Sequence, residues 1–377
     1  MGRKIAVNTR LLLSDKLEGI GTFTAEIFKI ICKENPDDEF HFIFDRKYNQ
    51  EFIFEKNVIP HVIMPPARHP LLLNIWYNFS LPRLLKKIDP DIFISPDAVT
   101  SLKINIPNLT VIHDINFVHR PDDLPKKWSE FYNKNTPKFI EKSNRIATVS
   151  EFSKMDIIKT YDTSPNKVDV VYNGVKTNFK PLAIENTRLI TNKHSEGKPF
   201  FFFIGSLHPR KNLKNLLIAF NEFKKMDEQD FKLIIGGEVM FKFESIQSVY
   251  EKLEFKHDVV FTGRLSDNDL NCFLSGATAL TYIPFFEGFG IPVLEAMACG
   301  TAVITSDTTS LPEVVGNAAY TVSPNSISEI STAMYELSTN KKYVEELVEK
   351  GYERLKLFTW KKSADALWQS IQKTLEK

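Results

Sequence analysis

Short apolar runs of strand length alternate with amphipathic segments along nearly the whole chain. The runs are often β-branched and are bounded by Pro, Asp, Asn or Gly, which is typical of buried strands. In the first half, we expect strands at Ile5–Val7, Phe40–Phe44, Asp91–Ser95, Thr110–His113, Ile146–Val149 and Val168–Tyr172. In the second half, we expect strands at Phe200–Ile204, Lys232–Ile235, Val259–Phe261, Leu280–Ile283, Ala302–Thr305 and Tyr320–Val322.

The segments between these runs have helical periodicity. Residues 23–32 place Phe23, Ile27, Ile30 and Ile31 on one face, and residues 126–141 behave similarly. Alternation of strand and helix predicts an α/β fold with parallel sheets that are covered on both faces. Two such series predict two doubly wound, Rossmann-like domains that face a central cleft.

The expected domains are residues 1–178 and 179–358. Residues 176–198 are polar, contain Pro181 and Gly197 and lack a strong period, so we expect a linker there. The end of the chain, residues 359–377, is amphipathic and aromatic. Such a helix needs a surface to cover, and we expect it to join the first domain.

Composition excludes several classes of protein. The chain has 377 residues, and Lys+Arg minus Asp+Glu is 48 − 47 = +1, so no strong field directs it to nucleic acid. Its 3 cysteines are far apart, which argues against a disulfide framework or a cysteine-built zinc site. The chain starts with a strand pattern and has no apolar run of about 20 residues, so we expect a cytoplasmic protein.

The richest candidate site is YIPFFEGFGIPVLEAMACG, residues 282–300. Two glycines precede a helix that Pro292 opens, and amides at a helix N-terminus favour a phosphate. Glu287 in the loop and Glu295 in the helix border this anion site and suit hydrogen bonds to hydroxyls of a sugar or ribose. The alternative is a Gly-rich turn with two solvated glutamates.

The second candidate is the loop after the run that ends at Gly205. Arg210 and Lys211 lie on this loop, where two cations could clamp a diphosphate. A solvated basic loop is the alternative. Because ligands gather at the carboxyl ends of parallel strands, this loop and the Glu287 loop belong to the same edge of one sheet.

Two further candidates lie in the first half. Gly19 and Gly21 fit a flexible loop that approaches a ligand and is followed by a helix capped by Thr22, or simply a loop with a cap. His113 and Asp114 end an expected central strand, where they suit a contact to substrate or a proton transfer. The alternative for His113 is a satisfied structural residue.

Together these motifs resemble glycosyltransferase family 4, the retaining nucleotide-sugar transferases of the GT-B fold. The resemblance is carried by the E-x7-E pattern in EGFGIPVLE, by Gly205 with Arg210 and Lys211, by Gly19–Gly21 and by His113–Asp114. Lesser matches are VSEFSK at 149–154, VYNGV at 171–175, FTGRLSD at 261–267 and SLPEVVG at 310–316. One departure is Ser206, since many members have Arg there, which leaves Arg210 and Lys211 to bind the diphosphate alone.

The resemblance implies that the second domain binds the nucleotide diphosphate-sugar and the first domain the acceptor. It assigns catalysis to His113, Asp114 and Glu287, and implies no metal or other cofactor. Base recognition is expected near Gly236–Gly237 and Gly263–Arg264. The implied donor-binding residues are Gly19, Gly21, Ser206, Arg210, Lys211, Gly263, Arg264, Gly288, Phe289, Gly290, Ile291 and Glu295.

The expected function is that of a retaining glycosyltransferase which moves a hexosyl group, by default mannose, to a hydroxyl of a glycan or lipid-linked acceptor. This fits cell-surface polysaccharide synthesis. Alternatives are a non-catalytic two-domain sugar-binding protein and a GT-B sugar-nucleotide epimerase. A nicotinamide dehydrogenase is disfavoured because GxGxxG is absent.

Peripheral contact with the inner face of the cell membrane is a further expectation from the resemblance. Two segments could form amphipathic basic helices on a membrane, or could pack their apolar faces on the first sheet. One is residues 76–88, and the other surrounds Lys126, Lys127 and Trp128. In the first segment the apolar positions are Trp76, Leu81, Leu84, Leu85 and Ile88, with Arg83, Lys86 and Lys87 as the basic ones.

Overall fold

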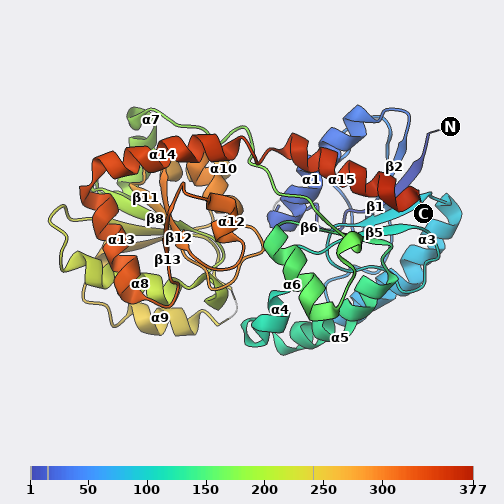
Figure 1. The fold of residues 1–377 in the computed structure, drawn as a ribbon, viewed down its shortest axis with the longest axis horizontal. Helices are drawn as coiled ribbons and strands as arrows, with labels where there is room; N and C mark the ends of the chain where they lie inside the picture. Colours follow the sequence, from blue (N-terminus) through green and yellow to red (C-terminus); the bar gives the residue numbers. More distant parts are fainter. Residues whose placement is uncertain (1, 15–16, 241, 377) are drawn as a thin grey trace. The chain divides into compact units, whose positions relative to one another are not determined.

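The computed structural model describes residues 2–14, 17–240 and 242–376. It divides into two compact units: residues 1–173 together with 360–377, and residues 174–359. The division falls after Asn173 rather than after residue 178, and the second unit keeps Thr359. Each unit is an α/β sandwich around an all-parallel sheet, as the alternation of strands and helices predicts (Figure 1).

The first unit contains a seven-stranded sheet with the strand order β3-β2-β1-β4-β5-β6-β7. Its strands are β1 (Lys4–Asn8), β2 (Glu39–Phe44), β3 (Val58–Val62), β4 (Ile92–Ser95), β5 (Asn108–Val111), β6 (Arg145–Thr148) and β7 (Val168–Val170). Its helices are α1 (Gly19–Glu34), α2 (Pro70–Ile75), the π-helix η2 (Trp76–Ser80), α3 (Leu81–Ile88), α4 (Asn116–His119), α5 (Lys126–Lys142), α6 (Glu151–Tyr161) and α15 (Trp360–Leu375).

Helix α15, the last element of the chain, packs along α1 in the first unit (Figure 1). Its apolar face is buried at Trp360, Ala364, Leu367 and Ile371. The Trp360 ring lies edge-on against Phe23 of α1, with 6.5 Å between ring centroids. The aromatic face of this helix therefore covers an internal surface of its own unit.

The second unit contains a six-stranded sheet with the order β10-β9-β8-β11-β12-β13. Its strands are β8 (Phe200–Ile204), β9 (Lys232–Gly236), β10 (Val259–Gly263), β11 (Ala279–Tyr282), β12 (Ala302–Ser306) and β13 (Tyr320–Val322). Its helices are α7 (Ile184–Ser195), α8 (Leu213–Lys224), α9 (Glu244–Tyr250), α10 (Asp267–Gly276), α11 (Ile291–Ala298), α12 (Leu311–Val315), α13 (Ile327–Thr339) and α14 (Lys341–Leu355). Helix α8 contacts α9 and α13, whereas α10 contacts α7 and α11 and α11 contacts α14, so these helices form two layers on opposite faces of the sheet.

Each sheet has one point where the strand order reverses. In the first unit it lies between β1 and β4, and in the second unit between β8 and β11. The connections leave these neighbouring strands toward opposite faces, which opens a crevice at their carboxyl ends. The loops that follow β8 and β11 carry Arg210, Lys211 and Glu287, so the fold places the two richest sequence motifs at one reversal point.

The expected linker at 176–198 is wrong in part, because residues 184–195 form helix α7. Among the side chains of this helix whose burial is described, those of Thr187, Thr191 and Ser195 are buried, at i, i+4 and i+8. Thr187 and Thr191 pack closely on Gly276 of α10, where an added Cβ would lie 3.3 Å from Thr191 Cγ2 and 3.5 Å from Thr187 Cβ. A helix that buries small polar residues has no apolar period, which is why the sequence pattern hides it.

Three other expectations need correction. Gly19 and Gly21 lie in the first turn of α1 rather than in a loop, and Glu18 rather than Thr22 occupies the N-cap position. A Cβ at Gly21 would lie 2.7 Å from the Leu11 carbonyl oxygen, so glycine here permits a close approach of two backbone segments. The strand before His113 ends at Val111 and does not extend to His113. The sequence pattern also missed the edge strand β3, because this strand contains a proline.

Candidate functional site

The reversal point of the second sheet holds a cluster of opposite charges. One carboxylate oxygen of Glu287, Oε2, lies 2.9 Å from Arg210 Nη1 and 2.6 Å from Lys211 Nζ. Arg210 Nη1 also donates to the Phe286 carbonyl at 2.8 Å. The loop after β8 is thereby tied to the loop after β11, and both predicted cations meet the predicted carboxylate.

Tyr282, the last residue of β11, is the third group that donates to this oxygen. Its hydroxyl lies 2.9 Å from Glu287 Oε2 and also accepts a hydrogen bond from Lys211 Nζ. Burial raises the pKa of Tyr282 well above its ordinary value, so the phenol stays neutral and can donate. The sequence pattern missed this residue, because an aromatic residue at the end of a buried strand looks like core.

The charges in this cluster stabilise one another. Burial raises the pKa of Glu287, but Arg210 and Lys211 outweigh that effect and lower it to about 2. The three side chains are 10–18% exposed, so the cluster is largely desolvated but still partly accessible. Such a site offers two fixed positive charges to an anion that can displace or share the carboxylate.

The loop that carries Glu287 is held by the residues after β12. Ser310 Oγ donates to the carbonyl oxygens of Glu287 at 2.8 Å and of Phe289 at 3.2 Å. Thr309 Oγ1 accepts the Glu287 amide at 3.3 Å. Because C=O and N–H point in opposite directions in a trans peptide, the amides of Gly288 and Gly290 point away from Ser310.

Helix α11 begins directly after this loop. Gly290 is its N-cap residue with φ +104°, and a Cβ there would lie 2.6 Å from Leu311 Cδ2. Ile291 and Pro292 form the start of the helix, as the sequence predicts. Phe289 is buried and packs edge-on against Phe358, which anchors the loop to the end of the unit.

Glu295 lies in α11 in a partly desolvated position. Burial raises its pKa to about 7, Lys176 works against that shift, and Asp267 adds to it. Lys176 and Asp267 themselves form an ion pair at 2.9 Å. Glu295 therefore changes charge close to neutral pH.

The remaining predicted residues of this unit lie around the same edge of the sheet. Gly205 and Gly237 directly follow the neighbouring strands β8 and β9, and a Cβ at Gly237 would lie 1.8 Å from the Gly205 carbonyl oxygen. Ser206 directly follows Gly205. Gly263 ends β10 with φ +72°, and the next residue, Arg264, lies 3.4 Å from Glu238 Oε1.

His113 and Asp114 belong to the first unit and follow β5. His113 Nε2 lies 3.0 Å from the Pro96 carbonyl oxygen, which can only accept, so Nε2 carries the proton. Burial lowers the pKa of His113, while the Pro96 hydrogen bond and the carboxylates of Asp114 and Asp97 oppose that shift. The ring is therefore neutral, and its Nδ1 is an acceptor.

Asp114 has a local structural role. Its Oδ1 accepts the amide of Asn116 at 3.0 Å, at the start of α4. Phe23 of α1 lies edge-on against the His113 ring, with 5.0 Å between centroids. The contact between helix α1 and His113 is therefore made by the Phe23 ring and not by a glycine loop.

Comparison with known proteins identifies the family to which the chain is similar. Residues 30–179 match the family model described as Glycosyltransferase Family 4, and residues 187–354 match Glycosyl transferases group 1. The chain is 30% identical over 307 residues to O-antigen chain mannosyltransferase RfbU of Salmonella typhimurium, covering 80% of this chain and 79% of that one. It is 27% identical to O-antigen chain mannosyltransferase B of Escherichia coli, over 67% of this chain and 66% of that protein.

A similar solved structure is that of HepE of Anabaena in complex with UDP-glucose, which superposes with a TM-score of 0.76 at 15% identity. The match covers 98% of this chain and 100% of that one. The same family assignment is supported by both family models and by the identity to RfbU, and the two parallel-sheet units are consistent with it. The chain therefore belongs to glycosyltransferase family 4 and is a glycosyltransferase of the GT-B fold.

Proposed function

We propose that the protein is a retaining glycosyltransferase which moves a hexosyl group, with mannose as the default, from a nucleotide diphosphate-sugar to a glycan or lipid-linked acceptor. The observation that carries this proposal is the pairing of Arg210 and Lys211 with Glu287 at the reversal point of the second sheet. The names of the O-antigen mannosyltransferases that it resembles support mannose and a role in cell-surface polysaccharide synthesis.

In this proposal the diphosphate binds where two cations already neutralise an anion. As the bond between the anomeric carbon and the phosphate oxygen breaks, negative charge grows on the departing diphosphate. Arg210 and Lys211 offset that charge, and no metal ion or other cofactor takes part. The acceptor oxygen forms the new bond on the same face of the sugar, and its proton passes to the departing phosphate.

Other residues orient the donor. In this proposal the amides of Gly288 and Gly290, which point away from Ser310, donate to the phosphates and the sugar. Glu287 keeps a second carboxylate oxygen for sugar hydroxyls, and Glu295 accepts hydrogen bonds from the ribose. His113 Nδ1 accepts a hydrogen bond from a hydroxyl of the transferred sugar, while Asp114 acts through the backbone around it.

Thermal unfolding with UDP, GDP, ADP, CMP and dTDP at matched concentrations tests the donor site. A ligand at about 100 times its Kd adds roughly 2.7 kcal/mol, which raises the unfolding midpoint of a unit of this size by about 5–11 °C. We expect one nucleotide to stand out and its effect to be lost in Lys211→Ala. Lys225→Ala, on an exposed helix end, is the matched control and keeps the full shift. The phosphate site is wrong if no nucleotide shifts the midpoint.

Nucleotide affinity should depend on pH through Glu295. The carboxylate is largely ionised above its pKa of about 7 and protonated below it. An ionised acceptor binds a hydroxyl more strongly than a neutral one, so we expect affinity to rise by about 3- to 10-fold from pH 6 to pH 8. Glu295→Gln, titrated at the same pH values, corrects for the phosphates of the ligand. An equal pH dependence in both proteins would exclude Glu295 as the ribose group.

We further propose that the first unit docks on the inner face of the cell membrane, but with a different surface from the one expected. Trp76, Leu81, Leu85 and Ile88 are buried, so the apolar face of that segment packs inside the unit. Among the described residues, no helix is both long and apolar enough to cross a membrane.

The exposed surface of residues 57–88, which include this segment, suits an anionic lipid headgroup layer. Residues 57–88 contain no Asp or Glu. The exposed basic side chains in this stretch are those of Arg68, Arg83, Lys86 and Lys87. The exposed apolar side chains are those of Ile59, Val62, Met64, Leu71 and Phe79. Apolar side chains that insert at the headgroup boundary, together with cations, are what interfacial binding requires.

Flotation with vesicles tests this docking. With vesicles that contain phosphatidylglycerol we expect the protein to float, and with phosphatidylcholine alone much less of it. The triple variant Met64→Ser, Leu71→Ser, Phe79→Ser should stay at the bottom, whereas Met155→Ser, which changes an exposed side chain of α6, should float normally. A native protein that remains at the bottom with anionic vesicles contradicts the docking surface.

A further inference from the structure

The reversal point of the first sheet also holds a buried charge pair. Arg10, after β1, forms an ion pair through Nε with Asp97, after β4. The Asp97 side chain is 2% exposed and that of Arg10 10%. Burial opposes the charged guanidinium, but Asp97 more than compensates and raises the pKa of Arg10 above its ordinary value. The Arg10 guanidinium therefore keeps its charge inside the unit.

Neutral side chains complete this network around the other oxygen of Asp97. Tyr77 OH donates to Asp97 Oδ1 at 2.6 Å, and Ser95 Oγ lies 3.1 Å from the same atom. Asn8 Nδ2 donates to Tyr77 OH at 2.6 Å. Burial raises the pKa of Tyr77 well above its ordinary value, so its hydroxyl keeps the proton that it donates.

The network fixes the peptide that His113 contacts. The carbonyl of Pro96 is part of the peptide plane that ends at Asp97, and it accepts the His113 Nε2 proton at 3.0 Å. Ala98, with φ +64°, donates its amide to the Val111 carbonyl at 2.9 Å, which ties the loop to the end of β5. A non-glycine residue in this backbone region persists only where its surroundings fix it.

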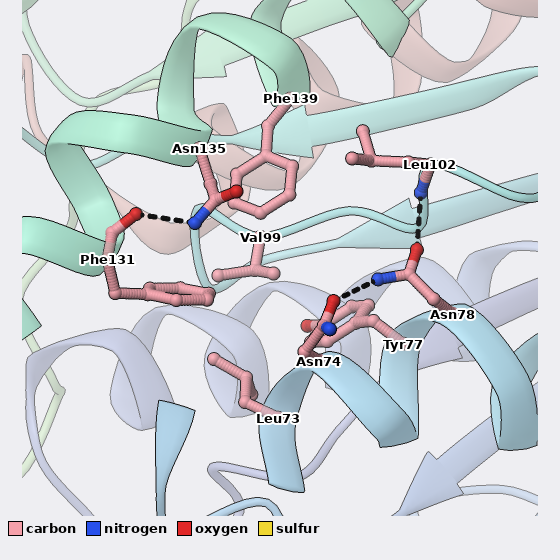
Figure 2. Close-up of a pocket in the computed structure, with 9 residues that line it drawn as sticks. All are labelled: Leu73, Asn74, Tyr77, Asn78, Val99, Leu102, Phe131, Asn135 and Phe139. Atoms are coloured by element: carbon pink, nitrogen blue, oxygen red, sulfur yellow. Dashed lines mark hydrogen bonds between the residues drawn. The ribbon is translucent and has the colours of Figure 1, made fainter. Parts of the chain in front are cut away.

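Direct contact with a sugar is not the role of this network. Asp97 is almost fully buried, and the cavity that Tyr77 helps to line has a volume of about 10 Å³, enough for one water molecule. Figure 2 shows Tyr77 in the wall of this cavity, with Asn74 and Asn78 from the same helical segment and Phe131 from α5. The described surroundings of Tyr77 thus leave no room for a sugar ring.

The second unit contains a similar arrangement that is more accessible. There the carboxylate of Glu287, in the loop after β11, is 14% exposed. It is contacted by Arg210, in the loop after β8 across the reversal point, and by the Tyr282 hydroxyl. In the first unit the corresponding carboxylate, Asp97, belongs to the residue that directly follows Pro96, whose carbonyl oxygen His113 contacts.

We propose that Asp97, held by Arg10 and Tyr77, is a positioning residue that sets the orientation and the Nε2–H tautomer of His113 through the Pro96 carbonyl. Its effect on sugar transfer rests on the proposed function. Loosening the network lets the Pro96 carbonyl tilt, so His113 no longer presents Nδ1 as a fixed acceptor. Neither the cations nor the loop amides of the second unit depend on this network.

A double-mutant cycle tests the proposal in transfer assays. Tyr77→Phe removes one hydroxyl and keeps the ring, so it perturbs the network with little risk to the fold. We expect it to lower kcat about 3- to 10-fold while the donor KM changes less than 2-fold. In a His113→Ala background the same change should have less than a 2-fold effect, because the residue it acts through is gone. If Tyr77→Phe lowers kcat by the same factor in the native protein and in the His113→Ala background, the proposal is overturned. Tyr161→Phe, which removes a hydroxyl on α6, should leave transfer unchanged.

A second measurement does not require transfer activity. Long-range ¹H–¹⁵N correlation spectra of the free full-length protein should show His113 as the neutral Nε2–H tautomer, with the signal assigned by its loss in His113→Gln. In Tyr77→Phe and Asp97→Asn we expect the signal to move toward a mixture of tautomers. An unchanged His113 signal in the folded Tyr77→Phe protein overturns the positioning role, whatever the transfer assay shows. If the native protein transfers no sugar but these shifts appear, the proposed function fails while the positioning role stands.

Discussion

The constraint on which both units depend is that a desolvated carboxylate at the reversal point of a parallel sheet must be neutralised by a cation across the crevice. An unpaired ion in such a place costs several kcal/mol, so Glu287 and Asp97 fix the loops that carry their partners. In the second unit this draws the loop with Arg210 and Lys211 onto the loop after β11. A bound diphosphate would then replace the Glu287 carboxylate as the anion next to Arg210 and Lys211. The two cations are already held together, so binding does not have to bring two unpaired cations close to each other.

The rest of the second unit holds this charge cluster in place. Ser310 and Thr309 fix the peptides around Glu287 and Phe289, and Gly290 allows the chain to turn into α11 beside Leu311. In the first unit, support for His113 comes from far along the sequence. Trp360 of the last helix packs on Phe23, and Phe23 packs on the His113 ring. A substitution at Trp360 in α15 can therefore alter the packing of His113, which lies more than 240 positions earlier in the chain.

Most of the fold was predictable because central strands such as β8, with its run of four phenylalanines, are buried on both faces and so read as continuous apolar runs. The pairing of Arg210, Lys211 and Glu287 at one edge followed from their places after strands. Helix α7 was not predictable, since its buried face is made of Thr and Ser. Tyr282 and Asp97 were missed because a buried aromatic and a lone carboxylate carry no motif, and only tertiary contacts show their partners.

The most direct test of this account measures sugar transfer and nucleoside diphosphate affinity in one preparation of Glu287→Gln. The account predicts that transfer falls by at least about 100-fold, because the reacting sugar and diphosphate lose their fixed charge arrangement. It also predicts that nucleotide affinity is retained or increases, since Arg210 and Lys211 no longer share their charge with an internal anion. Near-normal turnover in a folded Glu287→Gln protein would contradict the assignment of this site.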